Sequence, residues 1–262
     1  MNEARIGVGM GAVMLGYAGY LYSLDYARQR PQGRLPDGKD ATSAQVAIIE
    51  HADVRRMLLT QKAYVEGSFD LGLYAARLFD DTTTLETEAE RKQAHELLDL
   101  LTPIVKSWPS EFCLKANELA IQILGGHGYT REYPVEQYYR DNRLNPIHEG
   151  THGIQSLDLV MRKILLNADR KNYKVLKSRI YQTIENASGI VDDVYRNMLL
   201  EGLQQMDSIL DTMKKHMDEG RYHTLLLNVD PLRRAFFDLM LAWMHLWCLT
   251  LARPKLSAHT AG

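Results

Sequence analysis

One short stretch of this chain combines three features that could serve catalysis. They are the glycine-rich turn Gly125-Gly126-His127-Gly128, the charged pair Arg140-Asp141, and Glu149 between His148 and Gly150. Consecutive glycines let a ligand approach the backbone closely, and their amides can bind phosphate oxygens. A carboxylate before a helix can act as a general base, although it is more often a cap. These residue types therefore permit proton abstraction beside an anionic ligand.

Other catalytic patterns are not found in the sequence. There is no P-loop, no dinucleotide-binding fingerprint and no nucleophile motif of the Ser/His/Asp type. No second histidine or cysteine stands at metal-ligand spacing, so no metal site is predicted. Cys113 and Cys248 lie far apart without a CxxC pattern, which predicts free thiols and a cytoplasmic location.

The composition limits the classes of partner. The chain has 262 residues, of which 45% are hydrophobic, and its net charge is −2, which argues against a nucleic-acid partner. Residues 6–24 carry no charge and are long enough to span a bilayer, but five are glycine and three are tyrosine. This weak hydrophobicity predicts a buried helix and no membrane span.

Helical patterns extend over almost the whole chain, without alternating β-branched runs. A capping box at Thr83 and Glu86 predicts one helix start, and Pro109 predicts another because proline favours the first turn. The long helices predicted in the first half are 2–29, 43–78, 83–107 and 109–124, followed by a helix at 151–167. Four long helices with short connections predict an all-α fold, an up-and-down four-helix bundle.

The region after residue 168 is predicted to be an accessory helical extension. One apolar face steps by three and four residues through Leu199, Leu203, Met206, Leu210, Met213 and Met217. Gly220 is suited to end this helix, and Asp230-Pro231 to start the last one. Inward positions there are Leu232, Phe236, Leu239, Trp243 and Leu246. Such stripes indicate a core, so the predicted division is 1–168, bundle, and 169–262, extension.

The stretch from Gln122 to Thr151 resembles the signature of the acyl-CoA dehydrogenases. These FAD-dependent enzymes oxidise the α,β carbon–carbon bond of acyl-CoA thioesters. The first helix, from Asn2-Glu-Ala-Arg5 to Tyr26-Ala-Arg-Gln-Arg30, is similar to the start of the family's C-terminal helical domain. The resemblance covers roughly residues 1–165. The extension is similar to that of the subgroup that includes the methylthiopropanoyl-CoA dehydrogenases.

The resemblance assigns roles by position. It makes Glu149 the base that removes the α-proton, places Gly150 beside the thioester, and places Arg5 at the acyl end of the pocket. A carboxylate enclosed between flavin and thioester is desolvated, which makes it a stronger base. Two residues after the base would contact FAD, namely Thr151 and Gly153. Further residues would face the FAD of a neighbouring subunit, namely Arg30, Gln32, Gln122, Gly125 and Gly126.

The resemblance also implies partners. They are an acyl-CoA substrate, a second copy in a dimer or tetramer with a shared FAD site, and electron-transfer flavoprotein as acceptor. The family's N-terminal helical and middle β-domains would have to be supplied in cis or in trans, because this chain resembles only the C-terminal portion. Two positions depart from the family: Gln32-Gly33 replaces a common Phe-Gly, and His148 replaces an aromatic residue.

Two other functions remain open. The chain could be a catalytically silent helical module that mediates assembly. It could also be a flavoprotein of the alkylation-response type that binds DNA, although the net charge of −2 and the lack of a basic cluster after Asp169 argue against this.

Overall fold

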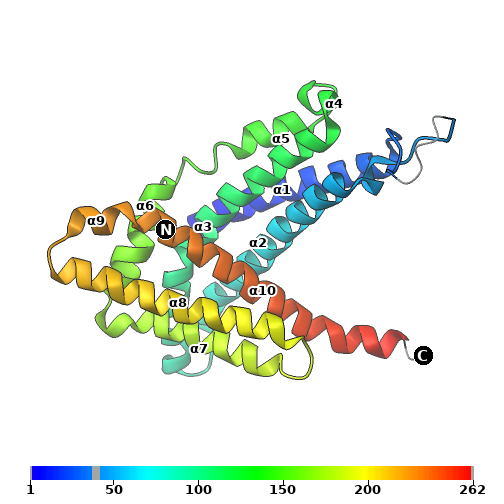
Figure 1. The fold of residues 1–262 in the computed structure, drawn as a ribbon. Helices are drawn as coiled ribbons and strands as arrows, with labels where there is room; N and C mark the ends of the chain where they lie inside the picture. The colour runs from blue at the N-terminus through cyan, green and yellow to red at the C-terminus, as the bar shows by residue number, and fades with distance from the viewer. Residues whose placement is uncertain (1, 37–41, 261–262) are drawn as a thin grey trace. The chain divides into compact units, whose positions relative to one another are not determined.

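The computed structural model describes residues 2–36 and 42–260, and within these ranges the protein is helical (Figure 1). The α-helices are α1 (Asn2–Gln29), α2 (Ala52–Thr84), α3 (Glu88–Leu124), α4 (Gly126–Tyr129), α5 (Val135–Asn142), α6 (His152–Leu157), α7 (Lys171–Asn186), α8 (Asp193–Asp218), α9 (Tyr222–Leu227) and α10 (Val229–Thr260). A π-helical segment, Asp158–Leu165, continues α6, and short 3-10 turns cover Ile48–Glu50 and Ala168–Arg170. The predicted all-α class is confirmed.

The chain forms two compact units. Unit 1 contains Met1–Ile6, Asp70–Val105 and Gly150–Gly262, and unit 2 contains Gly7–Phe69 and Lys106–Glu149. The sequence-based division at residue 168 rests on the change in helical pattern along the chain, which is a different criterion from spatial compactness, and it stays a prediction.

Close packing of α1 against α3 organises unit 2. A Cβ on Gly16 would lie 2.6 Å from Cys113 Cβ, and one on Gly19 would lie 2.5 Å from Asn117 Nδ2. The Asn117 amide also donates to the Leu15 carbonyl at 2.8 Å. Only glycine fits at these two positions, since a side chain would push the helices apart. Gly7 and Gly11, which have the small-xxx-small spacing, face open space instead.

Two predicted helices are one helix. The sequence predicted a break at Pro109, but α3 runs without interruption from Glu88 to Leu124. A proline inside a helix costs about 3 kcal/mol. The turns around it are buried, with Leu101, Ile104 and Trp108 fully inaccessible. Each such side chain stabilises the fold by roughly 1.5–3 kcal/mol, which is enough to hold the helix together across the proline.

Two predicted helix starts were wrong. Helix α2 begins at Ala52, not near residue 43, because the backbone of Val46 pairs instead with Gln32 and Gly33. The capping box before α3 is formed by Thr87 and Glu90, whose side chains accept from each other's amides at 3.2 and 3.1 Å. Thr83, the predicted cap, lies in the last turn of α2, where its hydroxyl donates to a backbone carbonyl.

In unit 1 the predicted apolar faces of the extension are confirmed except at Met217, which is only partly buried near the end of α8. The buried residues on α8 are Leu199, Leu203, Met206, Leu210 and Met213, and those on α10 are Leu232, Phe236, Leu239, Trp243 and Leu246. Gly220 follows α8 with a φ of 71°, as expected of a helix-ending glycine.

Among the described residues, the segment Val229–Leu256 of α10 is long and apolar enough to cross a membrane, with a mean hydropathy of 1.5. Of its most apolar window, 44% is buried inside the protein, and core helices pass the same test of length and composition.

Candidate active site

Glu149 has an unusual backbone conformation. It is exposed, it directly precedes Gly150 and the entry to α6, and its φ is 54°. Gly150 follows with a φ of 95°. Left-handed φ values are uncommon for residues with a side chain and cost of order 1–2 kcal/mol. Glu149 is one of three such non-glycine residues in the part of the chain that the structure describes. Strain of this kind is frequent at functional sites.

The residues after Glu149 form a tight turn into α6. The φ of Gly150 favours glycine, and a Cβ there would also lie 2.6 Å from Gln155 Nε2. Thr151 is the last residue with an extended backbone before α6, and its carbonyl accepts from the backbone N–H of Gln155 at 3.0 Å. Thr151 and Gly153, which were predicted to contact FAD, are both exposed.

Arg5 is anchored by an ion pair. Its Nη1 lies 2.7 Å from Asp158 Oδ2, with side-chain exposures of 12% and 8%. Arg162 donates to the other carboxylate oxygen at 2.6 Å. Burial alone would raise the pKa of Asp158, but the hydrogen bonds from Arg162 and Arg5 outweigh it and hold the pKa below its usual value. The structure thus fixes Arg5 against the π-helical segment, and its predicted contact with substrate stays a prediction.

In unit 2, the turn carrying Arg30 and Gln32 is stabilised by backbone pairing. Ile48 N donates to the Arg30 carbonyl at 2.8 Å, and Gln32 N donates to the Val46 carbonyl at 2.9 Å. Arg30 and Gln32 are both exposed. A depression of about 390 Å³ beside Arg30 has walls formed by Tyr22, Asp25, Tyr26, Gln29, Pro31 and Tyr133.

The three glycines of the turn after α3 have different reasons for being glycine. Gly125 has a φ of 61°, and a Cβ on Gly128 would lie 2.6 Å from the Ile121 carbonyl oxygen. Gly126 is exposed, and a Cβ there would meet nothing within 4 Å. The packing of this chain therefore does not require glycine at position 126. An exposed glycine without packing neighbours is expected where a ligand approaches the backbone closely.

Gln122 borders a second depression. It is exposed and lines a hollow of about 610 Å³ that also includes Arg131 and Arg140. Glu118 and Glu136 line the same hollow, so its two arginines are matched by two carboxylates. Sequence reasoning treated Arg140 only as a partner of Asp141, and it did not single out Arg131.

An aromatic cluster connects the two predicted cofactor segments of unit 2. The Tyr26 hydroxyl lies 2.8 Å from His127 Nδ1, and the rings of His127 and Tyr133 stack with centroids 4.8 Å apart. Tyr26 is one turn before Arg30, and His127 follows Gly126. Sequence reasoning missed this link, because only the fold brings residues 101 positions apart together.

The predicted residues therefore form one group in each unit. Arg5, Gly150, Thr151 and Gly153 belong to unit 1. Arg30, Gln32, Gln122, Gly125, Gly126 and Glu149 belong to unit 2. An exposed arginine, an open glycine and an exposed amide fit the diphosphate and adenine end of a dinucleotide, so the residues of unit 2 are compatible with FAD.

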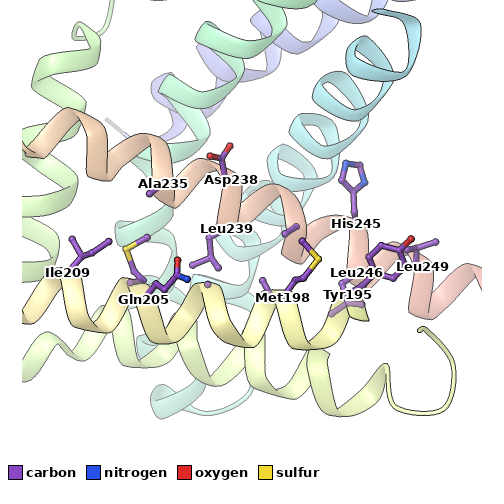
Figure 2. Close-up of a pocket in the computed structure, with 14 residues that line it drawn as sticks. Tyr195, Met198, Gln205, Ile209, Ala235, Asp238, Leu239, His245, Leu246 and Leu249 are labelled. Atoms are coloured by element: carbon purple, nitrogen blue, oxygen red, sulfur yellow. The ribbon is translucent and has the colours of Figure 1, made fainter. Parts of the chain in front are cut away.

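An apolar pocket of about 490 Å³ lies between α8 and α10 and contains none of these residues (Figure 2). Its apolar walls include Tyr195, Met198, Ile209, Leu239, Leu246 and Leu249, and its polar members are Gln205, Asp238 and His245. The described residues contain no cluster of histidine, cysteine, aspartate or glutamate that could hold a metal ion, and Cys113 and Cys248 are free thiols.

Comparisons with known proteins give a consistent result. Residues 1–165 match the family described as acyl-CoA dehydrogenase, C-terminal domain. The chain is 41% identical over 168 residues to a broad-specificity linear acyl-CoA dehydrogenase of Mycobacterium tuberculosis, covering 63% of this chain and 27% of that protein. It is 41% identical over 172 residues to 3-methylmercaptopropionyl-CoA dehydrogenase of Ruegeria pomeroyi, covering 65% of this chain and 28% of that protein. The matched region is thus under a third of these relatives' lengths.

Two solved structures share the fold over nearly the whole chain. ACDH-11 of Caenorhabditis elegans, in complex with C11-CoA, has a TM-score of 0.72 and 19% identity, covering 94% of this chain and 39% of that one. An acyl-CoA dehydrogenase from Bacillus anthracis, complexed with FAD, has a TM-score of 0.70 and 19% identity, covering 94% and 41%. The fold of the extension is therefore found in longer proteins together with that of the bundle.

Proposed function

Because the chain belongs to the acyl-CoA dehydrogenase family through its C-terminal domain, we propose that it supplies the catalytic base for FAD-dependent α,β-dehydrogenation of an acyl-CoA thioester. The observation that carries this proposal is the left-handed turn at Glu149 and Gly150, at the position that the family resemblance assigns to the base. The solved relatives with C11-CoA and with FAD support the ligand classes. The chain covers only part of these relatives, so the complete enzyme requires further domains in cis or in trans.

The proposed reaction divides between protein and cofactor. Glu149, which is exposed, takes the α-proton of the thioester. FAD, when bound, accepts the hydride from the β-carbon. Gly150 lets the thioester approach the backbone, while Arg5 lines the acyl end. Thr151 and Gly153 would contact the flavin.

The FAD of a neighbouring copy would be held by the exposed residues of unit 2. These are Arg30, Gln32, Gln122, Gly125 and Gly126. Electron-transfer flavoprotein is the proposed acceptor, and the two free thiols are consistent with a cytoplasmic location.

The Glu149→Gln variant tests whether Glu149 is the base. It is measured in the assembled enzyme, that is, this chain together with the further domains and FAD. The amide has nearly the shape of the carboxylate but cannot accept the proton, so flavin reduction by substrate should fall by about a hundredfold or more. Stopped-flow absorbance at the flavin band measures this step directly, and substrate binding should change little.

Glu185→Gln is the matched control, because Glu185 is an exposed glutamate on α7 in the extension. This variant should reduce flavin at the wild-type rate. If Glu149→Gln also retained that rate, Glu149 would not be the base.

Shared cofactor residues also predict self-association. Exposed Arg30 and Gly126 would face a second copy, so we expect a symmetric dimer, or a tetramer built from two dimers. Light scattering on the assembled enzyme measures its mass. A strict monomer at tens of micromolar, where standard interfaces are populated, would contradict the shared site.

A further inference from the structure

A polar link connects the last helix of the extension to α6, with Arg233 and Ser156 buried and the Asp230 side chain 41% exposed. Asp230, at the start of α10, accepts through Oδ1 from Arg233 Nε at 2.8 Å and lies 2.7 Å from Arg233 Nη2. The same oxygen lies 2.9 Å from the Ser156 hydroxyl on α6. That hydroxyl can donate to Asp230 or to the His152 carbonyl at 2.7 Å, and the ionised carboxylate is the stronger acceptor.

The arginine of this link is buried to an unusual degree. The Arg233 side chain is 1% exposed, and its guanidinium lies over the Phe237 ring, 4.6 Å from the centroid. Burial alone would raise the pKa of Asp230, but hydrogen bonding and the charge of Arg233, with the Ser156 bond, hold the pKa below its usual value. Asp230 is therefore held by the buried guanidinium on one side and by the Ser156 hydroxyl on the other. This hydrogen bond joins α6 to the start of α10.

Helix α6 packs against the backbone next to Glu149. Gln155 is fully buried, and its amide nitrogen would be 2.6 Å from a Cβ on Gly150. Gly150 therefore lies against Gln155 of α6. Gln155 directly precedes Ser156 along this helix. A shift of α6 would move Gln155 and change the packing against Gly150.

We propose that Arg233, Asp230 and Ser156 are positioning residues, through which the extension holds α6 and the backbone at Gly150, the residue after Glu149. The extension then belongs to the catalytic machinery by orientation, although none of these three residues touches the substrate. The importance of this turn rests on the proposed function of Glu149, but the mechanical link itself does not.

Hydrogen–deuterium exchange on the purified full chain tests the link without cofactor or activity. Ser156→Ala removes the donor of the link, and Asp230→Ala removes its acceptor. Peptides covering residues 150–157 should exchange roughly fivefold faster in each variant, the factor expected for one hydrogen bond, while α7 should be unchanged. The double variant should be no faster than the faster single variant, because both changes break one connection.

Asp207→Asn is the control, since Asp207 on α8 accepts from Tyr173 of α7 at 3.0 Å and lies elsewhere in the extension. It should speed exchange in α7 and leave 150–157 unchanged. Unchanged exchange at 150–157 in Ser156→Ala, or equal acceleration in all peptides of a folded variant, would overturn the proposal. A failure of Glu149→Gln to slow flavin reduction would overturn the proposed base and leave this link intact.

Discussion

Asp158 connects the start of α1 to the π-helical segment through ion pairs. It is nearly buried and paired with both Arg5 and Arg162. Replacing it with asparagine leaves the buried Arg5 without a counter-charge. We expect Asp158→Asn to lower the free energy of unfolding by about 3 kcal/mol, the usual cost of breaking a buried pair.

The contribution of Asp158 to the free energy of unfolding should depend on pH in a defined direction. The pKa of Asp158 is lowered in the folded protein. Its contribution is therefore fully present above the unfolded pKa, roughly pH 4, and is lost as the pH falls through the folded value. Urea unfolding followed by circular dichroism should show a difference between wild type and Asp158→Asn that shrinks in acid. Asp193→Asn, which breaks an exposed pair with Arg196, should cost less than about 1 kcal/mol. Equal effects of the two variants would contradict the account.

At the scale of elements, apolar periodicity correctly predicted which faces of the helices are buried. It missed features that depend on backbone pairing or packing between segments. The faces of α8 and α10 were correct because apolar spacing directly reports the buried side. The break at Pro109 was wrong because a local proline signal is weaker than the packing of Leu101 and Trp108. The start of α2 was wrong because Val46 pairs with a segment that the sequence does not place beside it. The link between Tyr26 and His127 could not be predicted for the same reason.

The helix caps allow a direct comparison of sequence and structure. Thr87→Ala removes the hydroxyl that caps the Glu90 amide, and should cost about 1 kcal/mol of stability. Thr83→Ala, at the cap predicted from sequence, should cost less, because this hydroxyl only donates to a carbonyl within α2. Denaturant unfolding measures both. A larger effect at Thr83 than at Thr87 would favour the helix start predicted from the sequence.

For the whole molecule, the exposure of the predicted site predicts that the isolated chain is colourless and inactive. Glu149, Arg30 and Gly126 are all exposed. Tight cofactor binding requires enclosure and buried apolar area. Absorbance at the flavin band after purification, followed by titration with FAD, measures this. Stoichiometric yellow protein that oxidises acyl-CoA unaided would show that this chain is a minimal enzyme.

The apolar pocket between α8 and α10 also affects how the protein behaves in the laboratory. Tyr195 and Met198 are 52% and 64% exposed along its wall. Dyes that become fluorescent on apolar surfaces will therefore find a binding site on the native state. A high signal at low temperature in a dye-based melt would report this surface rather than unfolded chain. The chain should also be retained on hydrophobic-interaction resins at salt concentrations where proteins with a fully polar surface elute.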